Sequence, residues 1–186
     1  MKVEATALPG VLLIEPRVFG DSRGYFFESW NRQRYREQGV EIDFVQDNLS
    51  YSERGVLRGL HCQQPYGQGK LVQVLEGEVF DVAVDIRRGS PTFGKSVSVY
   101  LSAENRRQLY IPPGFAHGFG VTSPHALFSY KCTDAYHPEC EFTVLWNDPA
   151  LALEWPIANP SLSDKDVKGL RLQDIPPDRL PVYVAP

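Results

Sequence analysis

The chain has 186 residues, enough for one compact domain with a sizeable hydrophobic core. Its composition, 42% hydrophobic and 23% charged, excludes a disordered protein, and its net charge of −4 argues against general binding to nucleic acid. No apolar run approaches the roughly 20 residues that cross a bilayer, so we expect a cytoplasmic protein that contacts no membrane. Cys62, Cys132 and Cys140 are odd in number and form no CxxC pair, which predicts three reduced thiols.

Short apolar or alternating segments between turn residues predict a series of β-strands. In chain order they cover residues 11–16, 70–86, 96–102, 107–113, 125–132 and 142–148. We interpret 70–86 as two strands joined by a tight turn at Glu76–Gly77. After that turn the side chains alternate. One face carries Val79, Asp81, Ala83 and Asp85, and the other carries Phe80, Val82, Val84 and Ile86.

The remaining segments predict little regular structure. A polar stretch over 31–39, closed by Gly39, is the one predicted helix. The tail from Trp155 to Pro186 is rich in Pro, Asp and Leu and predicts short helical turns and extended segments. Many short strands at close spacing favour a barrel or a sandwich. We therefore predict one mostly β domain over residues 1–186.

Two glycine- and histidine-containing motifs stand out as candidate site segments. The first is Gly55-x5-His61 with a closing Gly77, and the second is Pro112-x-Gly114-x-x-His117. They resemble the two motifs of the cupin superfamily. The resemblance implies a double-stranded β-helix, a jelly-roll barrel with short flanking helices, in which both histidines point into a common cavity.

The same comparison argues against a metal. Metal-binding cupins carry a second histidine two residues after the first and a glutamate shortly before the closing glycine. Here these positions hold Gln63 and Lys70. Two imidazoles beside an ammonium group offer a cation too few donors and a repulsive charge. We expect no metal site.

The departure from the metal motif favours proton transfer. A histidine is neutral and basic near pH 7, and in a water-poor cavity Lys70 could stabilise an enolate oxygen. A tyrosine on the opposite face could return the proton, and removal on one face with return on the other is epimerisation. His61 could instead be a structural barrel histidine, but Arg58 and Lys70 argue against that, since such cations seldom line a barrel without a ligand. Because no GxGxxG follows a strand, we expect no nicotinamide or other cofactor.

From end to end, the chain resembles the dTDP-4-dehydrorhamnose 3,5-epimerase family. The matching segments are FGDSRGYFFESW (19–30), FVQDNLSYS (44–52), GVLRGLHCQ (55–63), GKLVQVLEGEVFDVAVDIRRGSPTFG (69–94), LSAENRRQLYIPPGFAHGF (101–119), YKCTDAYHPE (130–139), WNDP (146–149) and LSDKD (162–166). The resemblance implies epimerisation at C3 and C5 of dTDP-4-dehydro-6-deoxy-D-glucose, which gives dTDP-4-dehydro-L-rhamnose. It places the reaction in dTDP-L-rhamnose biosynthesis.

The resemblance also implies catalytic roles for four residues. His61 would be the base that removes the protons at C3 and C5, and Asp166 would orient its imidazole. Lys70 would stabilise the enolate at O4, and Tyr130 would deliver a proton from the other face. Taken alone, Asp166 would be interpreted as a surface acid and Tyr130 as a packed aromatic.

The substrate carries a pyrophosphate and a thymine, and the resemblance implies a set of binding residues for them. Arg23 and Arg58 would clamp the pyrophosphate, Phe26 would stack on thymine, and His117 would line the sugar pocket. The other expected substrate contacts are Glu28, Gln46, Asn48, Gln73 and Tyr136. In this family the N-terminal segment crosses to a second subunit, so we expect a homodimer in which Arg23, Phe26 and Glu28 complete the partner's site.

Three alternatives remain open at this point. A sister epimerase would act at C3 or C5 only, although Tyr130 favours the double reaction. A metal-dependent cupin, such as a dioxygenase or a sugar-phosphate isomerase, is disfavoured by Gln63 and Lys70. A non-catalytic sugar-binding barrel would show no turnover.

Overall fold

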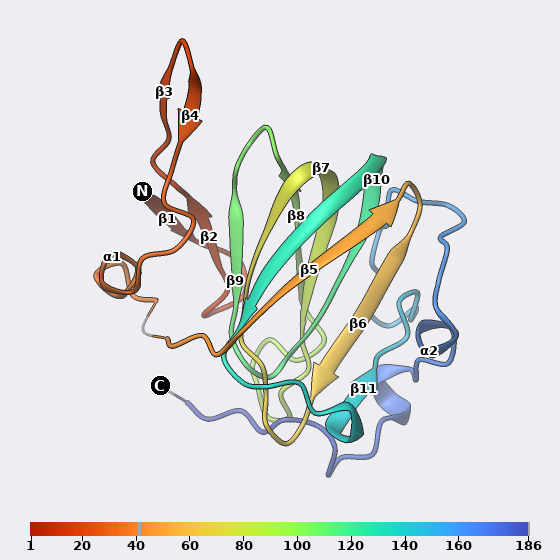
Figure 1. Cartoon of the computed structure of the whole chain (residues 1–186). Helices are drawn as coiled ribbons and strands as arrows, with labels where there is room; N and C mark the ends of the chain where they lie inside the picture. The colour runs from red at the N-terminus through yellow and green to blue at the C-terminus, as the bar shows by residue number, and fades with distance from the viewer. Residues whose placement is uncertain (41, 186) are drawn as a thin grey trace.

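The computed structural model describes residues 1–40 and 42–185 (Figure 1). Its strands are β1 (Lys2–Ala5), β2 (Leu12–Glu15), β3 (Phe19–Asp21), β4 (Gly24–Phe26), β5 (Gln46–Glu53), β6 (Leu57–Gln63), β7 (Lys70–Asp85), β8 (Ser96–Ser102), β9 (Gln108–Ile111), β10 (Phe115–Cys132) and β11 (Glu141–Thr143). Its helices are α1 (Arg32–Arg36), η1 (Pro138–Cys140), α2 (Asp164–Val167) and η2 (Leu172–Asp174). No helix in these two ranges is long and apolar enough to cross a membrane.

Two long strands, β7 and β10, hold the barrel together. They pair with each other along most of their length. The strand order of the main sheet is β1-β2-β9-β7-β10-β6-β11, and two further strands join it, since β5 pairs with β10 and β8 pairs with β7. The second half of β10 pairs with β5 and its first half with β6, so β10 contributes to both sides of the barrel. This is the mostly β, cupin-like barrel with few short helices that the sequence predicts.

The predicted tight turn at Glu76–Gly77 is wrong. β7 runs without interruption from Lys70 to Asp85 and bends at Gly77, whose φ is +77°. A Cβ at this position would collide with the carbonyl oxygen of His125, so only glycine fits here. The Glu-Gly pair resembles a hairpin turn locally, but β10 pairs with β7 on both sides of the bend and keeps the strand continuous.

The predicted alternation along β7 is confirmed, and both faces of the strand are buried. Val79 and Ala83 belong to the barrel interior with Phe119 and Phe128. The opposite face packs against the C-terminal segment, in a second core cluster that contains Val82, Val84, Ile86, Leu172, Ile175 and Leu180. The tail predicted as short turns and extended pieces therefore covers the outside of the barrel, where Figure 1 shows α2 and the C-terminal segment.

The N-terminal region is arranged differently. The predicted helix forms as α1, shorter than expected, with the side chain of Asn31 accepting a hydrogen bond from the Arg34 amide as its N-cap. Strands β3 and β4 make a separate two-stranded sheet, and Figure 1 shows this hairpin projecting away from the barrel. Phe26, at its end, is 64% exposed. Such a hairpin has few contacts of its own with the barrel.

The cysteines are all unpaired. Cys62 and Cys132 are buried, and Cys140 is partly exposed. Burial raises the pKa of the Cys62 thiol to about 12, with Lys70 opposing the shift. Cys62 is therefore a packing residue without thiolate chemistry.

Replacing Asp85 by asparagine is expected to destabilise the fold by about 2 kcal/mol at pH 7. Burial opposes ionisation of this carboxylate, but hydrogen bonds from Arg87, Ser90 and Thr92 outweigh it and lower its pKa to about 2. Because the folded-state pKa lies below the ordinary value of 3.8, the stabilisation is present above that pH and is lost as the pH falls towards 2.

Denaturant unfolding of the parent and the Asp85→Asn variant would measure this effect. The difference in unfolding free energy should shrink as the pH falls below about 4. Exposed Asp178→Asn is the matched control and should change little. An Asp85→Asn variant as stable as the parent at neutral pH would contradict the role of this network.

Candidate active site

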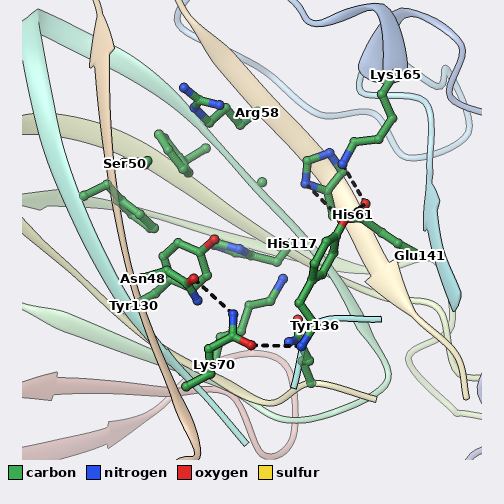
Figure 2. A pocket seen from close by; sticks show the side chains of 15 residues that line it. Asn48, Ser50, Arg58, His61, Lys70, His117, Tyr130, Tyr136, Glu141 and Lys165 are labelled. Carbon is green, nitrogen blue, oxygen red and sulfur yellow. Dashed lines mark hydrogen bonds and ion pairs between the residues drawn. The ribbon is translucent and has the colours of Figure 1, made fainter. Parts of the chain in front are cut away.

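One end of the barrel opens into a cavity of about 370 Å³. Strands β5, β6, β7 and β10 supply its walls, and the segment after β10 supplies part of its mouth (Figure 2). The cavity brings together eight of the residues predicted from the sequence: His61, Lys70, Tyr130, Gln46, Asn48, Arg58, His117 and Tyr136. Phe119 and Phe128 give it an apolar base.

His61 and Asp166 form a close pair although 105 positions separate them in the chain. Nε2 of His61 lies 2.5 Å from Oδ1 of Asp166, whose side chain is almost fully buried. Asp166 sits in α2, where the Ser163 hydroxyl caps the helix and donates to the other carboxylate oxygen at 2.8 Å. The carboxylate is thus fixed before any ligand arrives.

This contact determines which nitrogen of His61 can act as a base. With Nε2 facing the carboxylate, Nε2 carries the proton and Nδ1 keeps its lone pair. Nδ1 lies 4.0 Å from Oε1 of Glu141, another residue of the cavity wall. Burial lowers the pKa of His61 below its usual value, while Asp166 and Glu141 partly oppose that shift. The imidazole is therefore neutral and able to accept a proton near pH 7.

Lys70 and Tyr130 approach the same cavity from neighbouring strands. Lys70 is the first residue of β7 and pairs with Cys132 of β10, two positions from Tyr130, so both side chains share the inner face. Figure 2 shows Tyr130 and His61 on different sides of the cavity. Burial raises the pKa of the Tyr130 hydroxyl, which keeps it protonated at neutral pH.

A second histidine–carboxylate pair lies deeper in the barrel. Nε2 of His117 is 3.0 and 2.9 Å from the two carboxylate oxygens of Asp81, a fully buried residue. Within residues 1–40 and 42–185, His117 is the only side chain that hydrogen-bonds this carboxylate. A buried carboxylate requires such a donor, so Asp81 fixes the ring of His117. Sequence analysis did not select Asp81, although a charged residue between Val79 and Ala83 on an inward face was a usable signal.

Glu141 and Lys165 are further cavity residues that sequence analysis missed. Lys165 Nζ donates to Glu141 Oε2 at 2.7 Å, and the Tyr136 hydroxyl donates to the same oxygen at 3.0 Å. Burial opposes ionisation of Glu141, but Lys165, His61 and Tyr136 together lower its pKa. Lys165 lies inside the segment LSDKD and Glu141 lies two residues after YKCTDAYHPE, but nothing in the local pattern marked either as a cavity residue.

Part of the cavity wall, formed by β5 and by Arg58 of β6, is polar. The Arg58 guanidinium donates from Nε to the Ser52 hydroxyl at 3.0 Å, which holds it along β5 and β6. Gln46 donates from Nε2 to Asn48 Oδ1 at 3.0 Å, and its Oε1 accepts from the Tyr136 amide at 2.9 Å. A cation beside a row of amides suits an anionic, hydrogen-bonding ligand.

Of the predicted residues that do not line this cavity, Asp166 lies behind His61, and the other four lie elsewhere. Gln73 alternates with Lys70 and Val72 along β7, so it faces away, and its Oε1 accepts from Gln108 at 3.0 Å. The prediction that it contacts substrate disagrees with this placement. Arg23 and Phe26 belong to the projecting hairpin, where Arg23 pairs with Asp21 at 2.6 Å.

Glu28 also belongs to the N-terminal region and pairs with Arg34 of α1. None of these three N-terminal residues lines the cavity of its own chain. The expectation that they complete the site of a partner subunit stays a prediction.

No group of three or more His, Cys, Asp or Glu side chains in the described part of the chain could hold a metal ion. Position 63, where metal-binding cupins place a histidine, holds a glutamine whose amide bonds main-chain groups of two loops. The donor set that remains, two imidazoles already paired with carboxylates and an ammonium group, does not fit a metal.

The structure is thus a cupin-type barrel whose cavity holds a histidine backed by an aspartate, a lysine and a tyrosine, a set of groups suited to proton transfer. The family model for dTDP-4-dehydrorhamnose 3,5-epimerase matches residues 5–174. The chain is 57% identical to the dTDP-4-dehydrorhamnose 3,5-epimerase of Shigella flexneri, over 94% of this chain and 97% of that one. The chain belongs to the dTDP-4-dehydrorhamnose 3,5-epimerase family and is an epimerase.

Solved structures agree in fold. A dTDP-6-deoxy-D-glucose-3,5-epimerase from Legionella pneumophila, in complex with dTDP-4-keto-L-rhamnose, has a TM-score of 0.97 and 54% identity, over 99% of each chain. A 3′-monoepimerase from Streptomyces bikiniensis, in complex with dTDP-quinovose, has a TM-score of 0.89 and 34% identity, over 96% of this chain and 92% of that one. Double and single epimerases therefore share this barrel.

Proposed function

We propose that this protein inverts C3 and C5 of dTDP-4-dehydro-6-deoxy-D-glucose, without a cofactor, to give dTDP-4-dehydro-L-rhamnose. The observation that carries the proposal is the His61–Asp166 pair, which faces the same cavity as Lys70 and Tyr130. The relatives named above, one of which binds the 4-keto-L-rhamnose nucleotide, support this substrate class.

In this mechanism His61 is the base. A hydrogen on the carbon next to the 4-keto group is weakly acidic, and Nδ1 of a neutral imidazole removes it. As His61 becomes cationic, the Asp166 carboxylate at Nε2 stabilises the imidazolium and prevents its rotation. C3 and C5 both flank the ketone, so one base serves both carbons in turn.

Lys70 stabilises the negative charge that moves to the ketone oxygen. Lys70 is the first residue of β7 and lines the cavity together with the apolar Phe119 and Phe128, so its ammonium group is partly shielded from water. In such surroundings a fixed cation stabilises an enolate more than it would in bulk water. His117, fixed by Asp81, lines the sugar end of the same cavity.

The nucleotide part binds along the polar wall and the mouth. Arg58 supplies a cation for the pyrophosphate, and Gln46, Asn48 and Tyr136 offer amide and hydroxyl groups. We further propose a homodimer in which the projecting hairpin reaches the partner's mouth. Its exposed Phe26 would then stack on thymine, with Arg23 and Glu28 as polar contacts.

Turnover in deuterated water tests the proposal. A double epimerase must leave one deuterium at C3 and one at C5 of the product, because each inversion exchanges a proton with solvent. A sister enzyme that inverts a single carbon would label only that carbon, and this outcome would reassign the chain. Absence of any turnover or exchange would favour a non-catalytic binding barrel.

Replacing Tyr130 by phenylalanine is expected to slow inversion by about 10²–10⁴-fold, because the proton donor on the face opposite His61 is lost. His61 can still remove a proton and return one to the same face. Deuterium exchange into substrate should therefore outpace inversion, which mass spectrometry and nuclear magnetic resonance can compare. Tyr100→Phe, a partly exposed tyrosine on β8, is the control. An unchanged rate of inversion in Tyr130→Phe would show that another group supplies the proton.

A further inference from the structure

The segment that carries Tyr136 into the cavity mouth is fastened in an unusual way. Residues 133–137, after β10, form no strand or helix. Nevertheless, four successive residues each have one main-chain group bound to a glutamine side chain. These bonds are Gln68 to the Asp134 carbonyl, Gln63 to the Ala135 carbonyl, Gln46 to the Tyr136 amide and Gln63 to the His137 amide.

Gln63 is the central member of this group, and its amide makes three hydrogen bonds. Nε2 donates to the carbonyl oxygens of Ala135 at 3.0 Å and Tyr66 at 2.5 Å, and Oε1 accepts from the His137 amide at 2.8 Å. The side chain is 4% exposed. The loops present two carbonyl oxygens and one N–H to this side chain. Only a side-chain amide offers the two donors and the acceptor that match them.

Through these bonds Gln63 joins two loops of the mouth. Tyr66 belongs to the loop between β6 and β7, and its ring stacks on His137 of the other loop with centroids 4.5 Å apart. The Tyr136 hydroxyl reaches Glu141, next to Nδ1 of His61. The Gln63 amide therefore holds the main chain on both sides of Tyr136, while Gln46 binds the amide of Tyr136 itself.

We propose that Gln63 is a positioning residue that holds Tyr136 in place to bind the nucleotide part of the substrate. This inference rests on the proposed function, because it assigns Tyr136 to the nucleotide. Loss of a buried hydrogen bond of this kind leaves an unpaired polar group and is therefore unfavourable. Loss of the clamp should weaken dTDP binding about tenfold, which corresponds to about 1.4 kcal/mol. It should leave kcat nearly unchanged, since the His61 imidazole is held by Asp166 of α2, and the Gln63 amide bonds neither of these side chains.

Gln63→Glu is the sharpest variant. Glutamate has almost the same shape as glutamine, but an oxygen replaces the NH2 group. That oxygen would face the carbonyl oxygens of Tyr66 and Ala135, to which Gln63 donates. The dissociation constant of dTDP, measured by calorimetry, should rise about tenfold, and the Michaelis constant of the sugar nucleotide should rise with it. Gln173→Glu, an exposed glutamine with the same change of charge, should alter neither constant.

A double-mutant cycle with Tyr136→Ala separates positioning from general damage. If Gln63 acts through Tyr136, Gln63→Glu will have no further effect on dTDP affinity once Tyr136 is truncated. Equal losses of affinity in both backgrounds would overturn the inference. If the glutamate variant fails to fold, Gln63→Met, which removes the same bonds without a charge, enters the same cycle. A parent that neither binds dTDP nor turns over would instead refute the proposed function.

Discussion

Replacing His61 by asparagine is expected to lower kcat by about 10⁴-fold. The imidazole lines the cavity with its Nε2 bonded to the Asp166 carboxylate, so its Nδ1 is available to accept a proton. Asparagine keeps a similar size and polarity but cannot accept a proton from carbon. Because the change affects the chemical step, the dissociation constant of dTDP should stay within about twofold.

The measurement combines a coupled assay for turnover with calorimetry for dTDP. His125→Asn is the matched control, since His125 lies at the bend of β10 and outside the cavity. A His61→Asn enzyme with a normal rate would remove the base from the proposed mechanism. A variant that also lost dTDP binding would point to a damaged cavity, which circular dichroism and the melting temperature would reveal.

Replacing Asp166 by asparagine is expected to lower kcat by about 10²–10⁴-fold. The introduced side-chain amide would donate to Nε2 of His61 and thereby favour the imidazole form with its proton on Nδ1, which cannot act as the base. The imidazolium that forms during the reaction would also lose its negative partner. The matched control is Asp164→Asn, an exposed aspartate of the same helix.

The pH profile of kcat/KM distinguishes this role from a merely structural one. His61 acts when neutral, so the parent's rate should fall with decreasing pH through a pKa below 6.5, the direction that burial imposes. Asp166 raises that pKa, so its loss leaves burial less opposed and should move the acid limb to still lower pH. An acid limb that stays in place or moves upward in Asp166→Asn would contradict the pairing.

Most of the barrel could be predicted from local patterns. The alternation along β7 separated interior from exterior correctly, because each face of a strand meets a different environment. The bend at Gly77 could not be distinguished from a hairpin turn, because the decision depends on where β10 lies, and β10 is distant in the chain. The local sequence indicated that the glycine has an unusual backbone conformation, but not that the nearby carbonyl of His125 is what requires it.

Some residues of the site could likewise be predicted from local sequence, whereas others depend on contacts between distant segments. The positions of His61 and His117 followed from motif spacing, whereas the pairing of Asp166 with His61 depends on the C-terminal segment folding back over the barrel. Glu141 and Lys165 were missed because their pairing at the cavity joins two segments that lie 24 positions apart in the chain. Gln73 was assigned to the site, although strand alternation from Lys70 would have placed it on the outer face.

The position of α2 has a consequence for the order in which the protein is made. Every strand of the barrel is complete at Thr143, before α2 leaves the ribosome. A nascent chain of that length has its histidine, lysine and tyrosine but lacks the carboxylate that aligns the imidazole. In the proposed mechanism, a competent base is therefore assembled only after α2 has been made, later than every strand of the barrel.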